Sequence, residues 1–175
     1  MPHLKHIESM LTLPVHNYIV PGLTSWLIGE NPVTSEKVRA FTCSVNQQIG
    51  ITPHNHRYDF QCQVLRGQVI NTIWIEDSNG DEFVETRIKY GNEVGTYERQ
   101  ETKISKYIAN PEVYFPGDWY GLDHDEIHSI TFSKGAFVLF FEGKTLTNHS
   151  IMLEPYINGR HIPLGKVQDW MFQRE

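Results

Sequence analysis

The sequence predicts an all-β protein on the strength of three observations. Short segments rich in valine, isoleucine, threonine and aromatic residues recur along the chain, as they do in strands. Clusters of glycine, proline, serine, asparagine and aspartate separate these segments and predict turns, among them Ser78-Asn79-Gly80-Asp81, Asn110-Pro111 and Pro116-Gly117-Asp118. Beyond Pro14, the apolar spacing of a helix is hard to find. Many short strands with such punctuation are typical of a sandwich or a closed barrel.

A short N-terminal helix is the first expected element. Leu4, Ile7, Met10 and Leu11 have the spacing of an amphipathic helix, which ends before Pro14. Strands are then expected near residues 18–20, 24–28, 38–45, 59–65, 68–76, 82–89, 94–99, 102–108, 112–114, 129–132 and 136–141. The remainder, 144–175, has mixed composition and several prolines and glycines, which predicts an irregular C-terminal tail packed across the barrel.

Length and composition favour one domain spanning 1–175, with no disulfide scaffold, because the chain has only two cysteines. No apolar run approaches the roughly 20 residues that cross a bilayer, and no signal peptide is evident. We therefore expect a cytoplasmic protein without a membrane partner. The formal charge of −6 argues against nucleic-acid binding. The run 136–141 is apolar on both faces, which is compatible with a homodimer.

His54 and His56 are the first candidate site residues. They lie one residue apart on an extended segment, so both imidazoles face the same side, because side chains alternate along a strand. Two such rings can reach one divalent metal, and imidazole suits zinc, iron, nickel, copper and manganese. The following run ends in Val64-Leu65-Arg66-Gly67, as a strand closed by a glycine turn does. The sequence thus predicts a metal site where a barrel strand begins.

Residues 54–67 resemble the first motif of the cupin superfamily, His-x-His-x3-Glu-x6-Gly. Three residues separate His56 from Phe60 and six separate Phe60 from Gly67, so the spacing matches, although phenylalanine stands in place of the glutamate. The resemblance implies a cupin-like double-stranded β-helix, or jelly-roll barrel, with its core at about 38–142.

The family's second motif supplies one more histidine, and residues 114–132 resemble it. A Pro-Gly turn there precedes His128, which opens a strand of alternating apolar residues. The resemblance therefore implies that His128 is the third metal ligand. His124 is the alternative, although its Asp-His-Asp-Glu surroundings are typical of a solvated loop.

Phe60 in the glutamate position leaves three neutral imidazoles as ligands. Asp59 is a possible fourth ligand only if a bulge shifts the strand phase, because alternation otherwise turns it away from the histidines. Tyr58, Phe60 and Cys62 share the inward phase and are candidates for substrate contact. For Cys62 the ordinary interpretation is a small buried core residue.

Cupins with a three-histidine site resemble thiol and diketone dioxygenases, in which the substrate chelates the metal. The resemblance implies a mononuclear metal-dependent dioxygenase that acts on a small chelating organic acid, thiol or diketone. Fe(II) is the expected metal, with Zn, Mn or Ni as alternatives, and no catalytic side chain is assigned. A non-redox isomerase or lyase and a non-catalytic module that binds a small ligand remain open.

Overall fold

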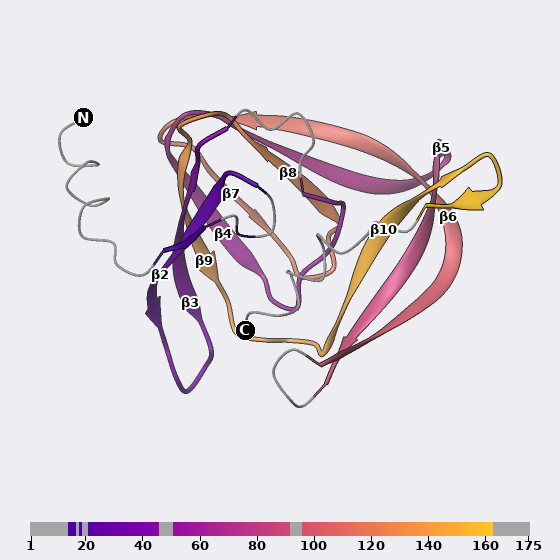
Figure 1. The fold of residues 1–175 in the computed structure, drawn as a ribbon, viewed down its shortest axis with the longest axis horizontal. Coiled ribbons are helices and arrows are strands. Elements are labelled where there is room, and N and C mark those ends of the chain that lie inside the picture. The colour runs from indigo at the N-terminus through magenta and orange to yellow at the C-terminus, as the bar shows by residue number, and fades with distance from the viewer. Residues whose placement is uncertain (1–13, 17, 19–20, 46–50, 92–95, 163–175) are drawn as a thin grey trace.

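The computed structural model describes residues 14–16, 18, 21–45, 51–91 and 96–162, and every regular element in this part of the chain is a strand (Figure 1). The strands are β1 (Val15–His16), β2 (Leu23–Glu30), β3 (Lys37–Cys43), β4 (Phe60–Arg66), β5 (Val69–Tyr90), β6 (Tyr97–Tyr114), β7 (Trp119–Leu122), β8 (His128–Phe132), β9 (Phe137–Glu142), β10 (His149–Ile157) and β11 (Arg160–His161). No helix in the described segments is long and apolar enough to cross a membrane. The predicted N-terminal helix lies outside the described residues.

Two antiparallel sheets form the fold. The first has the strand order β1-β2-β3-β9-β4-β7, and the second has the order β11-β10-β5-β6, with β8 paired to β5. Strand alternation sends one face of each strand into the core, as in β4, where Phe60, Cys62 and Val64 are buried. The main core joins these residues to apolar side chains of β8 and β9, including Ile130 and Phe140. The predicted all-β architecture is confirmed.

Strands β5 and β6 form one long hairpin where several short strands were predicted. The Ser78–Asp81 stretch, predicted as a turn, is instead a bulge, because both Glu76 and Asp81 pair with Tyr107. A Cβ atom added at Gly80 would lie 2.3 Å from the carbonyl carbon of Tyr107, so the bulge requires glycine at this close approach. Figure 1 shows that the hairpin bends. The first part of β5 pairs with β8, and its second part pairs with β10.

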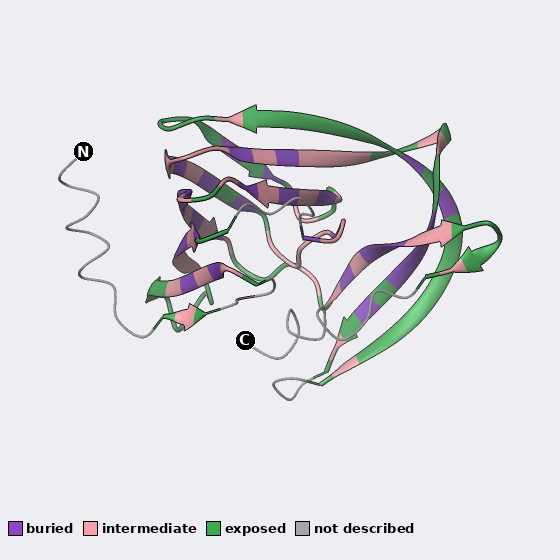
Figure 2. Ribbon diagram, turned by 45° about the horizontal axis from the view of Figure 1, so that its top comes forward, coloured by how far each residue is buried: buried purple, intermediate pink, exposed green. Residues whose placement is uncertain are grey.

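Strand β6 lies at the edge of its sheet and is exposed along most of its length (Figure 2). Its Pro111 pairs with Thr72 without a backbone donor, which an edge position tolerates. The Asn110-Pro111 pair, predicted as a turn, is therefore part of a strand.

The prediction of an irregular C-terminal tail is wrong for its first part, because β10 and β11 are regular. Seven residues of β10, from His149 to Pro155, pair with β5. The sheets consequently extend beyond the predicted core span of 38–142, with β2 before it and β10 after it. The rest of the predicted tail, 163–175, lies outside the described residues.

The segment from Ile51 to Asp59 precedes β4 and fills a place in the second sheet. The backbone NH and carbonyl groups of His54 exchange hydrogen bonds of 2.9 Å with those of His128, at the start of β8. On its other side, Asn55 donates to the carbonyl of Ile151 on β10. The segment therefore lies between β8 and β10, and its backbone pairing determines where its histidines point.

Candidate metal centre

Three histidines from two distant parts of the chain gather in one cluster. Antiparallel pairing of His54 with His128 puts both side chains on the same face of the sheet, and His56 shares that face by alternation. One nitrogen from each ring lies within 4.8 Å of the corresponding nitrogens of the other two. His54 and His128 are buried, and His56 is partly buried. The structure thus brings the three predicted histidine ligands together.

Hydrogen bonds to carbonyl oxygens orient two of these rings. The Nδ1 atom of His54 lies 2.7 Å from the backbone carbonyl of Thr52, and that of His128 lies 2.6 Å from Asn71 Oδ1. Because a carbonyl oxygen only accepts, each Nδ1 carries the proton. The Nε2 lone pairs of both rings are consequently available to a metal. Histidine ligands in metal sites are oriented in the same way.

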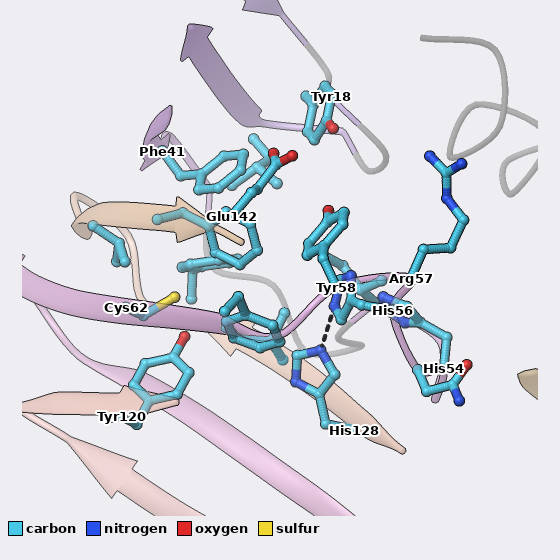
Figure 3. A pocket seen from close by; sticks show the side chains of 18 of the residues that line it. Tyr18, Phe41, His54, His56, Arg57, Tyr58, Cys62, Tyr120, His128 and Glu142 are labelled. Atoms are coloured by element: carbon cyan, nitrogen blue, oxygen red, sulfur yellow. Dashed lines mark hydrogen bonds between the residues drawn. The ribbon is translucent and has the colours of Figure 1, made fainter. Parts of the chain in front are cut away.

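The third ring faces the second across a short distance. His56 Nε2 lies 2.9 Å from His128 Nε2 (Figure 3). Since His128 carries its proton on Nδ1, its Nε2 accepts, and His56 donates in the metal-free protein. A divalent cation would replace this shared proton and take both lone pairs. The donor set therefore fits a small metal that binds imidazole.

Burial keeps the cluster uncharged. Desolvation lowers the pKa of His54, although its hydrogen bond to Thr52 opposes the shift. Desolvation also lowers the pKa of His56 and of His128 well below the usual value, and repulsion by neighbouring imidazoles adds to the effect. Neutral rings are the form that binds metal, so few protons compete for the site near neutral pH.

The cluster opens into a cavity of about 110 Å³ with mostly apolar walls. Phe60 stands where the motif that the sequence resembles has a glutamate, and its ring centroid lies 4.8 Å from that of His56 and 5.2 Å from that of His128. Phe140 on β9 packs against Phe60, with centroids 4.8 Å apart. An aromatic wall thus replaces a carboxylate beside the histidines.

The predicted substrate-contacting residues Tyr58, Phe60 and Cys62 all line this cavity. The ring of Tyr58 lies 5.3 Å from that of His56, and burial followed by the charge of Glu142 raises the pKa of its hydroxyl well above the usual value. Burial also raises the pKa of the Cys62 thiol to about 12. Cys62 is therefore a neutral thiol, a much weaker metal ligand than a thiolate.

Asp59 and His124 lie together, outside the residues that line the cavity. Asp59 Oδ1 accepts a hydrogen bond of 2.8 Å from the backbone NH of His124 and lies 3.1 Å from its Nδ1. The side chain of Asp59 is 53% exposed. No bulge turns it inward, so the alternation along the strand holds. The structure thus places both alternative ligands apart from the three-histidine cluster.

Sequence reasoning missed the residues that support the cluster. Asn71 is 2% exposed on β5, in a strand whose inward neighbours Val69 and Ile73 are apolar. A polar residue in an inward position was the available signal. The ion pair of Arg39 with Glu142, 2.5 Å between Nε and Oε1, was also missed, and Glu142 lines the cavity.

Neither the protein-family models nor the curated proteins include a match to this chain. Solved structures do match. The hydroxypropylphosphonic acid epoxidase of S. wedmorenis has a TM-score of 0.48 and 11% identity over 75% of this chain, which spans 54% of the epoxidase. KdgF from a Halomonas species has a TM-score of 0.40 and 15% identity, over 71% of this chain and 82% of its own.

A cupin superfamily protein from Desulfitobacterium hafniense has a TM-score of 0.40 and 11% identity, over 70% of this chain and 76% of its own. The chain spans about half the length of the epoxidase, and at these identities the likenesses concern the fold alone. The two antiparallel sheets and the three gathered histidines agree with the fold and the ligand set that the sequence motifs led us to expect.

Proposed function

We propose that this protein binds one divalent metal through His54, His56 and His128, and that this metal is Fe(II). We further propose that the protein uses dioxygen to oxidise a small molecule that chelates the metal. A single observation supports the proposal most strongly. One nitrogen from each of three buried or partly buried imidazoles lies within 4.8 Å of the other two, and carbonyl oxygens hold two of the rings in the required tautomer. This arrangement is poor as ordinary core packing, because it groups polar nitrogens next to aromatic rings.

Charge balance points to an anionic substrate. Three neutral imidazoles leave the two positive charges of the metal uncompensated, whereas a glutamate ligand would cancel one of them. The carboxylate among the residues that line the cavity is that of Glu142, which already pairs with Arg39. A substrate that binds through two oxygens, or through oxygen and sulfur, supplies the missing negative charge. Small organic acids, thiols and diketones meet this requirement.

The protein's own contribution is orientation and exclusion of water. Phe60 and Phe140 cover one side of the cluster, and the ring of Tyr58 lies beside His56. A cavity of about 110 Å³ has little room for water beside a substrate. Bound Fe(II) would supply open coordination positions and one-electron chemistry toward dioxygen, as it does in other mononuclear iron sites.

Oxygen uptake by reconstituted protein tests this proposal. The chain is stripped of metal, loaded with Fe(II) without air, and then mixed with aerated thiols, diketones and hydroxy acids, one compound at a time. Uptake that depends on one compound, and that disappears in His54→Ala/His56→Ala, is the expected result. His124→Ala is the matched control, because it removes an imidazole outside the cluster.

Two results would contradict the proposal. Iron binding without oxygen uptake for any chelator, together with turnover of a sugar or keto acid by zinc- or manganese-loaded protein, indicates a non-redox isomerase or lyase. No metal binding at all indicates a module that binds a small ligand without turnover.

A further inference from the structure

Tyr120 is a cavity-lining polar residue that the proposed function leaves without a role. It lies on β7 and is 7% exposed, and its ring stacks on Tyr114 with centroids 4.6 Å apart. Its hydroxyl oxygen is one of two buried side-chain oxygens or nitrogens that have no hydrogen-bond partner among the described residues. Buried hydroxyls are normally hydrogen-bonded, so this one is available to something that enters the cavity.

The thiol of Cys62 is the polar neighbour of this hydroxyl. Cys62 and Tyr120 are paired across β4 and β7, and Figure 3 shows the hydroxyl turned toward the sulfur. The two groups are near enough to influence each other's ionisation, but they do not form a hydrogen bond of ordinary geometry. A neutral thiol is a weak partner in any case, so it leaves the hydroxyl able to donate elsewhere.

The hydroxyl and the histidines lie at two ends of the same cavity. The Phe60 ring borders both, with its centroid 5.2 Å from that of His128 and 6.4 Å from that of Tyr120. Past Phe60, the gap between the cluster and Tyr120 is therefore about the length of one aromatic ring. A molecule held by the metal at one end reaches the hydroxyl if its body has the length of a single ring.

The walls between these ends are apolar, and the charged groups near them are engaged. Among the residues that line the cavity are Phe41, Ile51, Ile130, Phe132, Val138 and Phe140. Arg57 is the cation in this lining, and its guanidinium lies 4.1 Å over the ring of Tyr90, pointing away from the histidines in Figure 3. If a ligand carried a second charged group, it would therefore find no cation to pair with along these apolar walls.

The volume limits the size of the ligand. An apolar protein cavity of about 150 Å³ takes up benzene. The cavity here is somewhat smaller, about 110 Å³. A body of one small ring, or an aliphatic group of similar size, fills it.

We propose that the substrate is a compact molecule with two chelating oxygens at one end and an uncharged hydroxyl or carbonyl group at the other, which hydrogen-bonds to Tyr120. The inference rests on the proposed function in one respect, because it assumes that the chelating end meets a metal on the three histidines. Tyr120 then selects the substrate by its far end, and the apolar walls reject a second carboxylate or phosphate.

Three pyrones with the same chelating edge test this inference. Allomaltol has a methyl group opposite that edge, kojic acid has a hydroxymethyl group there, and comenic acid has a carboxylate. Each is titrated by calorimetry into zinc-loaded wild-type protein, Tyr120→Phe and Tyr114→Phe. Tyr114→Phe is the matched control, because it removes a hydroxyl that already bonds to Glu112 outside the cavity. Zinc content is measured first, by elemental analysis and without any pyrone.

The ratio of the allomaltol Kd to the kojic acid Kd is the decisive quantity, because the intrinsic affinity of each pyrone for zinc cancels between proteins. We expect this ratio to fall by about three- to tenfold in Tyr120→Phe, the usual value of one hydrogen bond, and to stay unchanged in Tyr114→Phe. Comenic acid should bind at least about tenfold more weakly than allomaltol to the wild type.

An unchanged ratio in Tyr120→Phe, an equal fall in Tyr114→Phe, or comenic acid as tight as allomaltol overturns the inference. Any of these results with zinc bound leaves the metal-site proposal intact. Absence of zinc from the wild type overturns both proposals, so the two failures are distinguishable.

Discussion

Asn71→Leu tests how the protein prepares His128 for a metal. The asparagine is 2% exposed, and its Oδ1 lies 2.6 Å from Nδ1 of His128, which is 3% exposed. Leucine has a similar size but cannot accept the proton, so a buried donor is left without a partner. Loss of such a hydrogen bond costs about 1–3 kcal/mol of stability in the metal-free protein. Loss of a group that orients a histidine ligand weakens metal binding about 10- to 100-fold.

Zinc affinity is measured by competition with a coloured chelator, and stability by urea unfolding of the metal-free proteins. Thr86→Val is the matched control, because Thr86 is 1% exposed and donates a hydrogen bond of 2.6 Å to Glu154, away from the cluster. The control should lose stability by a similar amount and keep its zinc affinity within about twofold. Asn71→Asp restores an acceptor and should restore affinity.

The reasoning is refuted if Asn71→Leu binds zinc within about twofold of the wild type. The reasoning is also refuted if Thr86→Val loses as much zinc affinity as Asn71→Leu does. The loss would then come from general destabilisation of the fold and not from the orientation of His128.

The remaining predictions concern Phe60 in the cavity wall, the pH dependence of stability and the β5 bulge at Gly80. Phe60→Glu places a carboxylate beside the cluster, so zinc should bind more tightly and anionic chelators more weakly in the same competition assay; unchanged affinity would mean that the new side chain points elsewhere. The metal-free protein should lose stability as pH falls below about 6.5, by up to about 1.4 kcal/mol per pH unit for each cluster histidine. The reason is that burial lowers the pKa of these histidines in the folded protein, so the unfolded chain binds more protons in this pH range. Urea midpoints that do not change between pH 7 and 5 would contradict this sign. Gly80→Ala should destabilise the protein by about 1–3 kcal/mol, because its Cβ meets the Tyr107 backbone at 2.3 Å, and a thermal midpoint equal to that of the wild type would show that the bulge relaxes.

The strands could be predicted where they are short and bounded by tight turns. β4 and β8 follow alternation, and the phase of β4 correctly directs Phe60 and Cys62 inward. Local signals failed where tertiary pairing decides the structure. The Ser78–Asp81 stretch has the composition of a turn, but β6 continues past it, so the extra residues are accommodated as a bulge. β10 is a strand because β5 offers it an edge, and its own sequence contains Pro155.

The histidines themselves were predictable, and their surroundings were not. The His-x-His spacing and alternation identify His54 and His56, because both facts are local. Asn71 is 57 positions from its partner His128, so no spacing rule connects the two. The position of Tyr120 at the far end of the cavity likewise depends on the pairing of β4 with β7.

Metal content tests the central claim most directly. The wild type, His54→Ala/His56→Ala and His124→Ala are each loaded with Fe(II) without air, freed of excess metal and subjected to elemental analysis. The account predicts about one iron per chain in the wild type and in His124→Ala, and almost none in the double variant that remains folded. Equal iron in all three proteins, or none in the wild type, would contradict a metal centre on these histidines.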